Sequence, residues 1–341
     1  MKPTDFAKYL TDFFGIYLPT ECGVSHNTIL TYSYTFSLLI EYMRTQELLA
    51  PQRITLNDIT KERVINFLSW LEIERNCSIS TRNARLAVLH SFYNYLQYRD
   101  VKGIFRYHEI MSIKRKKTTT PEMAYLTVKG IELIFKQPDL KTKYGRRDFV
   151  LLALLYDSGA RVQELIDITP SNIQFNDTTI VKLRGKGNKT RIVPLSKNQA
   201  NNLKKYIYDE GLMNPEKQCC PIFCNYRGEK LSRMTVLNIV KKYGNMARME
   251  SPTSIPENLG CHSFRHSKAM HLLDADINLV YIRDFLGHTS ITTTEIYARA
   301  SEKKKQDALS RVNPGIVTDA KSTWQKDKTL LGYLKDLQSK Y

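Results

Sequence analysis

The sequence predicts a mainly α-helical fold with a small β-sheet (α+β): a four-helix N-terminal domain, then a mixed helical domain with a three-stranded sheet and a β-hairpin. Apolar residues recur at helical spacing through about the first 110 residues. Short β-like segments occur only after residue 170, among further helical patterns. A basic, proline-containing stretch separates the two parts, and 341 residues suffice for two domains with separate cores.

Four amphipathic helices account for the N-terminal part. The first lies within residues 4–18 and the second within residues 25–46. The third follows Thr60, a residue type that caps helix N-termini, and the fourth lies within residues 80–99. Helices of this length joined by brief loops predict a small bundle.

The second part begins with a buried helix around residues 149–156, which ends near Gly159. Three strands follow, "IQF", "TTIVKL" and "KTRIVPL". Glycines in "RGKGN" predict a hairpin between the last two strands, with Lys186 at its exposed tip. Helical patterns then continue from Ser196 to about Asn313.

These patterns predict four segments along the chain. They are a helical domain (1–113), a basic linker (114–125), a mixed domain (126–313) and a tail (314–341). The tail contains one more apolar helical stretch, "TLLGYLKDLQSKY", which needs a surface to cover in this molecule or in a neighbour.

The charge balance predicts a polyanionic partner. The chain has 51 Lys and Arg against 34 Asp and Glu, a formal net charge of +17. Nucleic acid is the usual partner of so basic a protein. An anionic membrane surface would be the competing partner, but no lipidation motif supports it, so no membrane partner is expected.

Nothing in the sequence predicts entry into a membrane. The most apolar run, Phe149 to Tyr156, is much shorter than the roughly 18 residues of a spanning helix, and the N-terminus lacks a signal-peptide pattern. We therefore expect a cytoplasmic protein with reduced cysteines. Cys219, Cys220 and Cys224 lack a second ligand pair at zinc-site spacing, so we expect buried free thiols there.

Four short segments carry side chains suited to chemistry on a phosphate. Their candidate residues are Arg161, Lys186, His262, Arg265, His288 and Tyr297. Singly, each is weak, since an arginine or lysine near a turn is usually a surface residue. Together, two guanidiniums can bind non-bridging oxygens, His262 can act as a base and Lys186 as an acid. This set requires no metal or other cofactor.

The order of these segments resembles the tyrosine recombinase (phage integrase) family of site-specific DNA recombinases. "GARVQEL" (159–165) resembles the first arginine motif of the family, and "GKGNKTRIVPL" (185–195) its β-hairpin lysine motif. "HSFRH" (262–266) matches the His-x-x-Arg box, and "LGHTSITTTEIY" (286–297) the terminal His-to-Tyr box. The similarity covers residues 126–313, and the helical front part resembles the family's core-binding, SAM-like domain.

The resemblance implies a role for each candidate residue. Arg161 and Arg265 would bind the scissile phosphate, with a further hydrogen bond from His288. Tyr297 would attack phosphorus, leaving a 3′-phosphotyrosyl link, while His262 takes up its proton. Lys186 would protonate the departing 5′ oxygen.

Two neighbours of these residues also carry predictions. Glu164 would be a supporting residue, with an exposed helix charge as the alternative. Gly287, directly before His288, predicts a tight corner at that histidine.

The resemblance also implies partners. They are double-stranded DNA with inverted-repeat core sites, a homotetramer on two duplexes, and accessory DNA-bending or directionality factors. The tail would dock on a neighbouring protomer. Candidate DNA contacts, with solvated surface as the alternative, are Arg82, Arg85, Lys114, Arg115, Lys116 and Lys117.

Two other functions stay open at this point. One is a type IB topoisomerase-like relaxase, which shares the tyrosine chemistry, and the other is a non-catalytic DNA-binding factor with this fold. Strand exchange between two sites separates a recombinase from a relaxase, and cleavage separates both from a binding factor. The target sequence, and the choice among integration or excision of a mobile element, transposition, inversion and dimer resolution, do not follow from the sequence.

Overall fold

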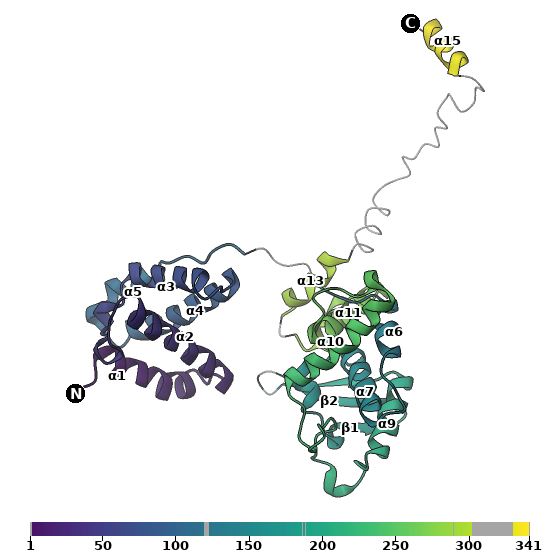
Figure 1. The fold of residues 1–341 in the computed structure, drawn as a ribbon, viewed down its shortest axis with the longest axis horizontal. Coiled ribbons are helices and arrows are strands. Elements are labelled where there is room, and N and C mark those ends of the chain that lie inside the picture. Colours follow the sequence, from purple (N-terminus) through teal and green to yellow (C-terminus); the bar gives the residue numbers. More distant parts are fainter. Residues whose placement is uncertain are drawn as a thin grey trace. The chain divides into compact units, whose positions relative to one another are not determined.

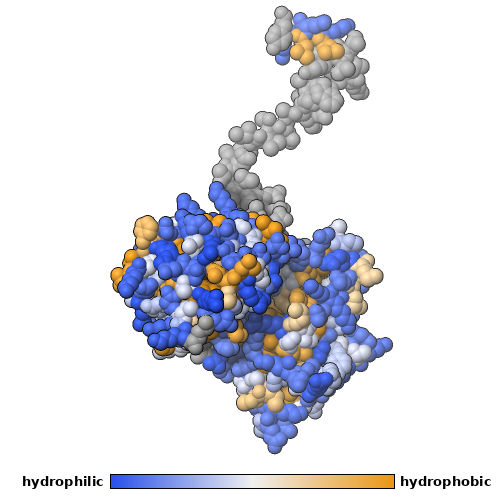
Figure 2. Space-filling model, turned by 60° about the vertical axis from the view of Figure 1, so that its left-hand side comes forward, coloured by the Kyte–Doolittle hydropathy of each residue, from blue (hydrophilic) through white to orange (hydrophobic). Residues whose placement is uncertain are grey.

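The computed structural model describes residues 2–118, 123–185, 187, 189–288, 290–301 and 330–340. The chain divides into two compact units, Met1–Pro121 and Glu122–Tyr341 (Figure 1). Each unit has its own hydrophobic core. Among the described residues, none of the helices combines the length and the apolar composition that a membrane span requires. The face shown in Figure 2 is mainly hydrophilic, with scattered hydrophobic patches.

Every element of regular structure in the described part of the first unit is a helix. Its α-helices are α1 (Asp5–Asp12), α2 (His26–Thr45), α3 (Lys61–Ile73), α4 (Ile79–Gln97) and α5 (Ile104–Met111). α1 continues as a π-helix, η1 (Phe13–Glu21), and short 3₁₀ turns are η2 (Pro51–Arg53), η3 (Leu56–Asp58) and η4 (Val101–Gly103). The four predicted helices are present, and α5 adds a fifth that packs on α3 and α4.

Local sequence explains where these helices begin. The predicted cap Thr60 is confirmed, because its hydroxyl accepts a hydrogen bond from the backbone of Arg63. Ser25 and Ser78 cap α2 and α4 in the same way. The apolar faces then meet in a core rich in aromatic rings, in which Phe13 lies fully buried.

The second unit combines helices with one small sheet (Figure 1). Its α-helices before the sheet are α6 (Val128–Lys136), α7 (Lys143–Asp157) and α8 (Val162–Ile166). Those after it are α9 (Lys197–Asp209), α10 (Arg233–Glu250), α11 (Cys261–Asp274), α12 (Leu279–Leu286) and α13 (Thr292–Ala300). Short 3₁₀ turns are η5 (Pro170–Asn172), η7 (Pro215–Lys217) and η8 (Pro252–Ser254). A separate helix, α15 (Leu330–Lys340), lies in the predicted tail stretch.

The sheet confirms the three predicted strands. They are β1 (Ile173–Phe175), β2 (Thr179–Arg184) and β3 (Thr190–Pro194), antiparallel in the order β1-β2-β3. Alternate residues of β2 are buried, as expected for a strand with one face on a core. Between β2 and β3, Gly187 has a positive φ of 72°, which suits a hairpin turn.

The ends of α7 and α12 lie next to candidate catalytic residues. α7 is the predicted buried helix, and Gly159 follows its end in the left-handed conformation, φ 56°. Gly287 ends α12 with φ 64°, which confirms the predicted corner before His288. Helix prediction to Asn313 falls partly outside the described residues, beyond Ser301.

The cysteine prediction needs a correction. All six cysteines are free, but Cys219 and Cys220 are exposed and Cys224 is half-buried. Ile222 and Phe223 of the same segment fill the core, whereas the thiols of Cys219 and Cys220 lie on its exposed side. Among the described residues, no group of three His, Cys, Asp or Glu side chains is arranged to hold a metal ion.

Candidate active site

Arg161 and Glu164 form the first part of the site. The turn at Gly159 makes Arg161 the N-cap of the short helix α8, and Glu164 lies one turn further. The Glu164 carboxylate accepts hydrogen bonds from the backbone N (2.9 Å) and Nη1 (2.8 Å) of Arg161. Glu164 is 3% exposed, so the alternative of an exposed helix charge is wrong.

The carboxylate of Glu164 stays ionised in this position. Burial opposes its ionisation, but hydrogen bonds and charge attraction from Arg191, and then hydrogen bonds from Arg161, outweigh burial and lower the pKa of Glu164. Arg161 itself is one-third exposed, at 33%, and so keeps part of its guanidinium open to solvent.

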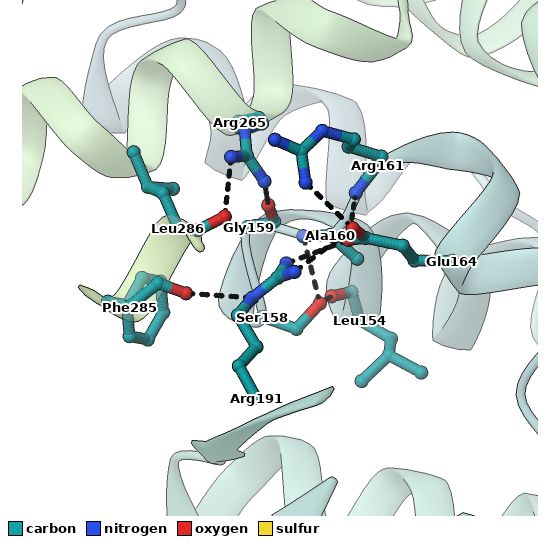
Figure 3. Close-up of polar contacts among 10 residues, drawn as sticks. All are labelled: Leu154, Ser158, Gly159, Ala160, Arg161, Glu164, Arg191, Arg265, Phe285 and Leu286. Carbon is teal, nitrogen blue, oxygen red and sulfur yellow. Dashed lines mark hydrogen bonds and ion pairs between the residues drawn. The ribbon is translucent and has the colours of Figure 1, made fainter. Parts of the chain in front are cut away.

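Arg265 approaches the same place from α11 (Figure 3). Its Nη1 donates to the carbonyl of Gly159 (2.7 Å), and its Nη2 donates to the carbonyl of Leu286 (2.6 Å). Burial, together with the charges of Arg161 and Arg191, lowers the pKa of Arg265 to about 9. The guanidinium is therefore still charged at neutral pH, in a place where an anion would stabilise it.

Two predicted histidines, His262 and His288, lie close to Arg161 and Arg265. His288 bonds through Nδ1 to the Thr294 hydroxyl at 2.9 Å, and burial followed by nearby guanidiniums lowers its pKa to about 4. His262, on α11, remains accessible to solvent. Partial burial and the charges of Arg265 and Arg161 lower the pKa of His262. Both rings are thus neutral at pH 7, and each can accept or donate a hydrogen bond.

Tyr297 lies on α13 and is 1% exposed. Its ring stacks on His288, with centroids 6.3 Å apart and planes within 9° of parallel. Its phenol oxygen is 3.1 Å from Nδ1 of His266, and this is the hydrogen bond of the phenol among the described residues. Burial raises the pKa of Tyr297, against the opposing charges of Arg265 and Arg161.

A polar cleft of about 480 Å³ connects several of these residues. Arg161 and His288 line it, together with Gly185, Lys189 and Arg191. A Cβ atom at Gly185 would lie 3.0 Å from Oε1 of Glu164 and 3.7 Å from Nη1 of Arg161, so the base of the β2–β3 hairpin passes close to the arginine. Lys186 itself lies outside the described residues.

The structure thus brings five of the six predicted catalytic residues to one region of the second unit. Two further residues of this region were not predicted. His266 follows Arg265 directly in "HSFRH", and Arg191 lies in the "KTRIVPL" strand. The signal for each was its place inside a recognised motif, but spacing alone did not reveal its partners.

The candidate DNA contacts of the first unit are less uniform than predicted. Arg82 is buried, with Nε 3.3 Å from a Glu72 oxygen. Arg85 donates to the Thr35 hydroxyl at 2.9 Å and lies over the ring of Tyr34. Lys116 bonds to Glu72 at 2.8 Å. Lys116 is nevertheless exposed, as are the other three candidates, Lys114, Arg115 and Lys117.

Comparison with known proteins identifies the family. Residues 124–304 match the phage integrase family, and residues 11–100 match its N-terminal SAM-like domain. The chain belongs to the phage integrase family. The match to the first of these covers more than half of the chain, and it confirms the predicted resemblance to tyrosine-type site-specific recombinases.

Relatives of this integrase-family chain match it over nearly their whole length. A putative integrase/recombinase, y4rC, from Sinorhizobium fredii is 28% identical over 98% of this chain and 99% of its own. The tyrosine recombinase XerD from Listeria innocua is 28% identical over 89% of this chain and 98% of its own.

Solved structures of the family share the fold. XerH site-specific recombinase bound to palindromic difH substrate has a TM-score of 0.67 at 23% identity, covering 83% of this chain and 79% of its own. Tn1549 transposon integrase in complex with circular intermediate DNA has a TM-score of 0.68 at 17% identity, covering 91% of this chain and 100% of its own. The predicted fold class is therefore confirmed.

Proposed function

We propose that this protein is a site-specific DNA recombinase that breaks and rejoins DNA through a 3′-phosphotyrosyl link to Tyr297. A cluster of arginines carries this proposal: Arg161 and Arg191 line the cleft with His288, on which Tyr297 stacks, and Arg265 lies buried close to both arginines. Arg161, Arg191 and Arg265 bear three positive charges, and Glu164, which bonds to two of them, bears one negative charge. A phosphodiester would compensate the excess.

Arg161 and Arg265 would bind the non-bridging oxygens of the scissile phosphate. A guanidinium has five N–H donors. The bonds of Arg265 to the carbonyls of Gly159 and Leu286 engage one N–H each on Nη1 and Nη2, so other N–H groups are left for an anion. His288, which is neutral and lines the cleft, would add a hydrogen bond. These donors would stabilise the charge that gathers on the phosphate in the transition state.

In the cleavage step, the phenol oxygen of Tyr297 forms a bond to phosphorus while the bond from phosphorus to the 5′ oxygen breaks. The phenol proton passes to His262, and Lys186 gives a proton to the departing 5′ oxygen. The approach of Gly185 to Arg161 supports the assignment of its neighbour Lys186 to this site. Tyr297 is covered in the free protein, so its oxygen has to become accessible before attack.

Rejoining reverses the same steps. A 5′ hydroxyl from another strand attacks the phosphotyrosyl bond and releases Tyr297. Since one phosphoester replaces another, the reaction needs neither ATP nor a metal ion. Hydrolysis, by contrast, would give the phosphate to water and leave a permanent break.

Double-stranded DNA is the proposed substrate, held in part by exposed lysines and arginines of the first unit such as Lys114, Arg115 and Lys117. We further propose inverted-repeat core sites, a homotetramer on two duplexes, and action in the cytoplasm on chromosomal or mobile DNA. Leu334 and Leu337 of α15 are 49% and 38% exposed, which supports docking of this helix on a neighbouring protomer. Truncation after Asn313 should then weaken assembly on paired sites more than binding to one site.

Adduct formation on a defined site tests the chemistry. The target is first selected from random duplexes with the Tyr297→Phe variant, which should bind without cutting. A duplex of that sequence with a nick next to the cleavage point then traps the intermediate. Wild-type protein should become covalently linked to DNA in chelator as well as in magnesium, with nucleotides on the peptide that contains Tyr297.

Two outcomes would overturn parts of this proposal. Cleavage that requires a metal and leaves no adduct would exclude the tyrosyl mechanism. An adduct with relaxation of supercoiled DNA, but without recombinant products from two sites, would instead indicate a relaxase.

A further inference from the structure

Arg191 makes a more extensive set of contacts than a surface arginine on a hairpin strand requires. It lies on β3, opposite Leu183 of β2, and its side chain is 11% exposed. Nη1 and Nη2 donate to the two carboxylate oxygens of Glu164 at 3.0 and 2.8 Å, a bidentate pair. Nε donates to the carbonyl of Phe285 at 3.0 Å (Figure 3).

Glu164 is shared between two arginines. Oε1 accepts from Nη1 of Arg161 and Nη1 of Arg191, while Oε2 accepts from the backbone N of Arg161 and Nη2 of Arg191. A carboxylate offers about four acceptor positions, so these bonds use all of them. The position of one arginine therefore depends on the other.

The charges explain why two arginines are needed. With Arg161 alone, the buried carboxylate would form a neutral pair and draw the guanidinium toward itself. An incoming phosphate would then meet a negative charge that Arg161 already compensates. With Arg191 in place, the carboxylate is compensated from the other side, and the positive charge of Arg161 remains for the phosphate.

Arg191 also contacts the corner that carries His288. A Cβ atom at Gly287 would lie 2.9 Å from Cδ of Arg191, so the arginine stem lies directly against the glycine. The bond to Phe285 fixes the last turn of α12 to the same side chain. Arg191 thus joins the hairpin strand, the start of α8 and the end of α12.

We propose that Arg191 is a positioning residue of the active site: it compensates Glu164 so that Arg161 stays available to the scissile phosphate, and it fixes the hairpin strand to the His288 corner. This rests on the proposed recombinase function. Arg191 lines the cleft, but its three nitrogens are already engaged with Glu164 and Phe285, which favours positioning over direct phosphate contact.

A rescue experiment distinguishes these roles. The variants are Arg191→Met, Glu164→Gln and the double variant, with Arg227→Met as a control at an exposed arginine outside the cleft. The rate of covalent adduct formation is measured in single turnover, alongside DNA affinity and thermal unfolding. Arg191→Met should cleave slowly, because Glu164 is left without its second cation.

The double variant should form the adduct roughly tenfold or more faster than Arg191→Met, because it no longer carries the uncompensated negative charge of Glu164. DNA affinity should be unchanged in all variants, and Arg227→Met should cleave like the wild type. Recovery is not expected if Arg191 only supports the fold or touches phosphate itself.

Each other result has a definite meaning. A rate for Arg191→Met equal to wild type overturns the inference, as does a folded double variant without recovery, which would indicate direct phosphate contact. Equal loss of thermal stability and rate in Arg191→Met and the double variant would reduce Arg191 to a structural residue. If wild-type protein itself forms no adduct, the proposed function fails, whatever Arg191 does.

Discussion

The phenol oxygen of Tyr297 lies 3.1 Å from Nδ1 of His266, the residue that directly follows Arg265 in α11. The ring of His262 is a neighbour of His266, with centroids 6.1 Å apart, but the phenol bonds to His266. The nucleophile of the proposed reaction therefore has a specific, half-buried partner in the free protein.

The bond between Tyr297 and His266 should stabilise the folded second unit. Tyr297→Phe removes the hydroxyl and leaves Nδ1 of His266 without it, so the free energy of unfolding of the second unit should fall by about 1 kcal/mol. Urea unfolding, monitored by hydrogen exchange in peptides of α11 and α13, measures this loss of stability. Tyr281→Phe is the control, because Tyr281 is 72% exposed, and it should change nothing. Equal stabilities for both variants would show that the bond contributes little.

Arg161 and Arg265 should differ in what their loss does to the fold. Either substitution by alanine removes a phosphate donor, so adduct formation should slow by roughly 10²–10³-fold. Arg265→Ala also leaves the carbonyls of Gly159 and Leu286 without their partner, which should cost about 1–3 kcal/mol of stability. Arg161→Ala should unfold close to wild type in the same urea series. Equal stability of the two variants would contradict the structural part of this prediction.

Stability should decrease between about pH 6.5 and 4. The pKa values of His266 and His288 are about 4 in the folded protein, with burial as the main cause, against about 6.5 when unfolded. In this range the unfolded chain binds more protons, so acid favours unfolding, and the stability is fully present above pH 6.5.

Unfolding of the second unit, followed at a series of pH values, measures this effect. His266→Phe should flatten the dependence, while His26→Gln, at an exposed histidine, should not. An unchanged slope in His266→Phe would show that this ring does not contribute.

Gly287→Ala should destabilise the second unit for two reasons. The residue has φ 64°, which costs an L-residue about 1–2 kcal/mol, and the added Cβ would meet Arg191. Gly228→Ala is the matched control, because Gly228 has φ 78° but nothing within 4 Å of the added atom. Thermal unfolding should shift more for Gly287→Ala, and adduct formation should slow only there. Equal shifts would mean that Arg191 moves aside freely.

In the first unit, substitution of Lys117 should affect DNA affinity, whereas substitution of Arg82 should affect stability. Lys117 is exposed, so Lys117→Ala should weaken DNA binding and reduce the slope of log affinity against log salt by about 1. Arg82 is buried against Glu72, so Arg82→Ala should lower stability instead. Fluorescence anisotropy at several salt concentrations, with thermal unfolding in parallel, compares them. A normal salt slope for Lys117→Ala would remove it from the DNA contacts.

Much of the fold could be predicted because its signals are local. Thr60 caps a helix through its own side chain, and the strands around Gly187 follow from alternation and turn chemistry. The catalytic candidates were found in the same way, as short motifs in a fixed order. The expectation that they gather in one region of the second unit came from the resemblance.

The remaining features depend on contacts between distant segments. Arg191 bonds to residues 27 and 94 positions away, and no spacing rule connects them. The burial of Arg82 depends on Glu72, which lies on another helix. The sequence could not decide whether Glu164 is a supporting residue or an exposed helix charge for the same reason, because its second arginine partner, Arg191, comes from the sheet.

The burial of Tyr297 bears on how such an enzyme can share a cell with a whole chromosome. Random collisions with duplex DNA bring phosphates to the arginines, but the hydroxyl that would cut them is packed against His266 and His288. Contact with foreign sequence alone would not cut the chromosome in the proposed reaction, because the hydroxyl would first have to be uncovered. In the proposed reaction, genome integrity is protected by the same packing that stabilises α13.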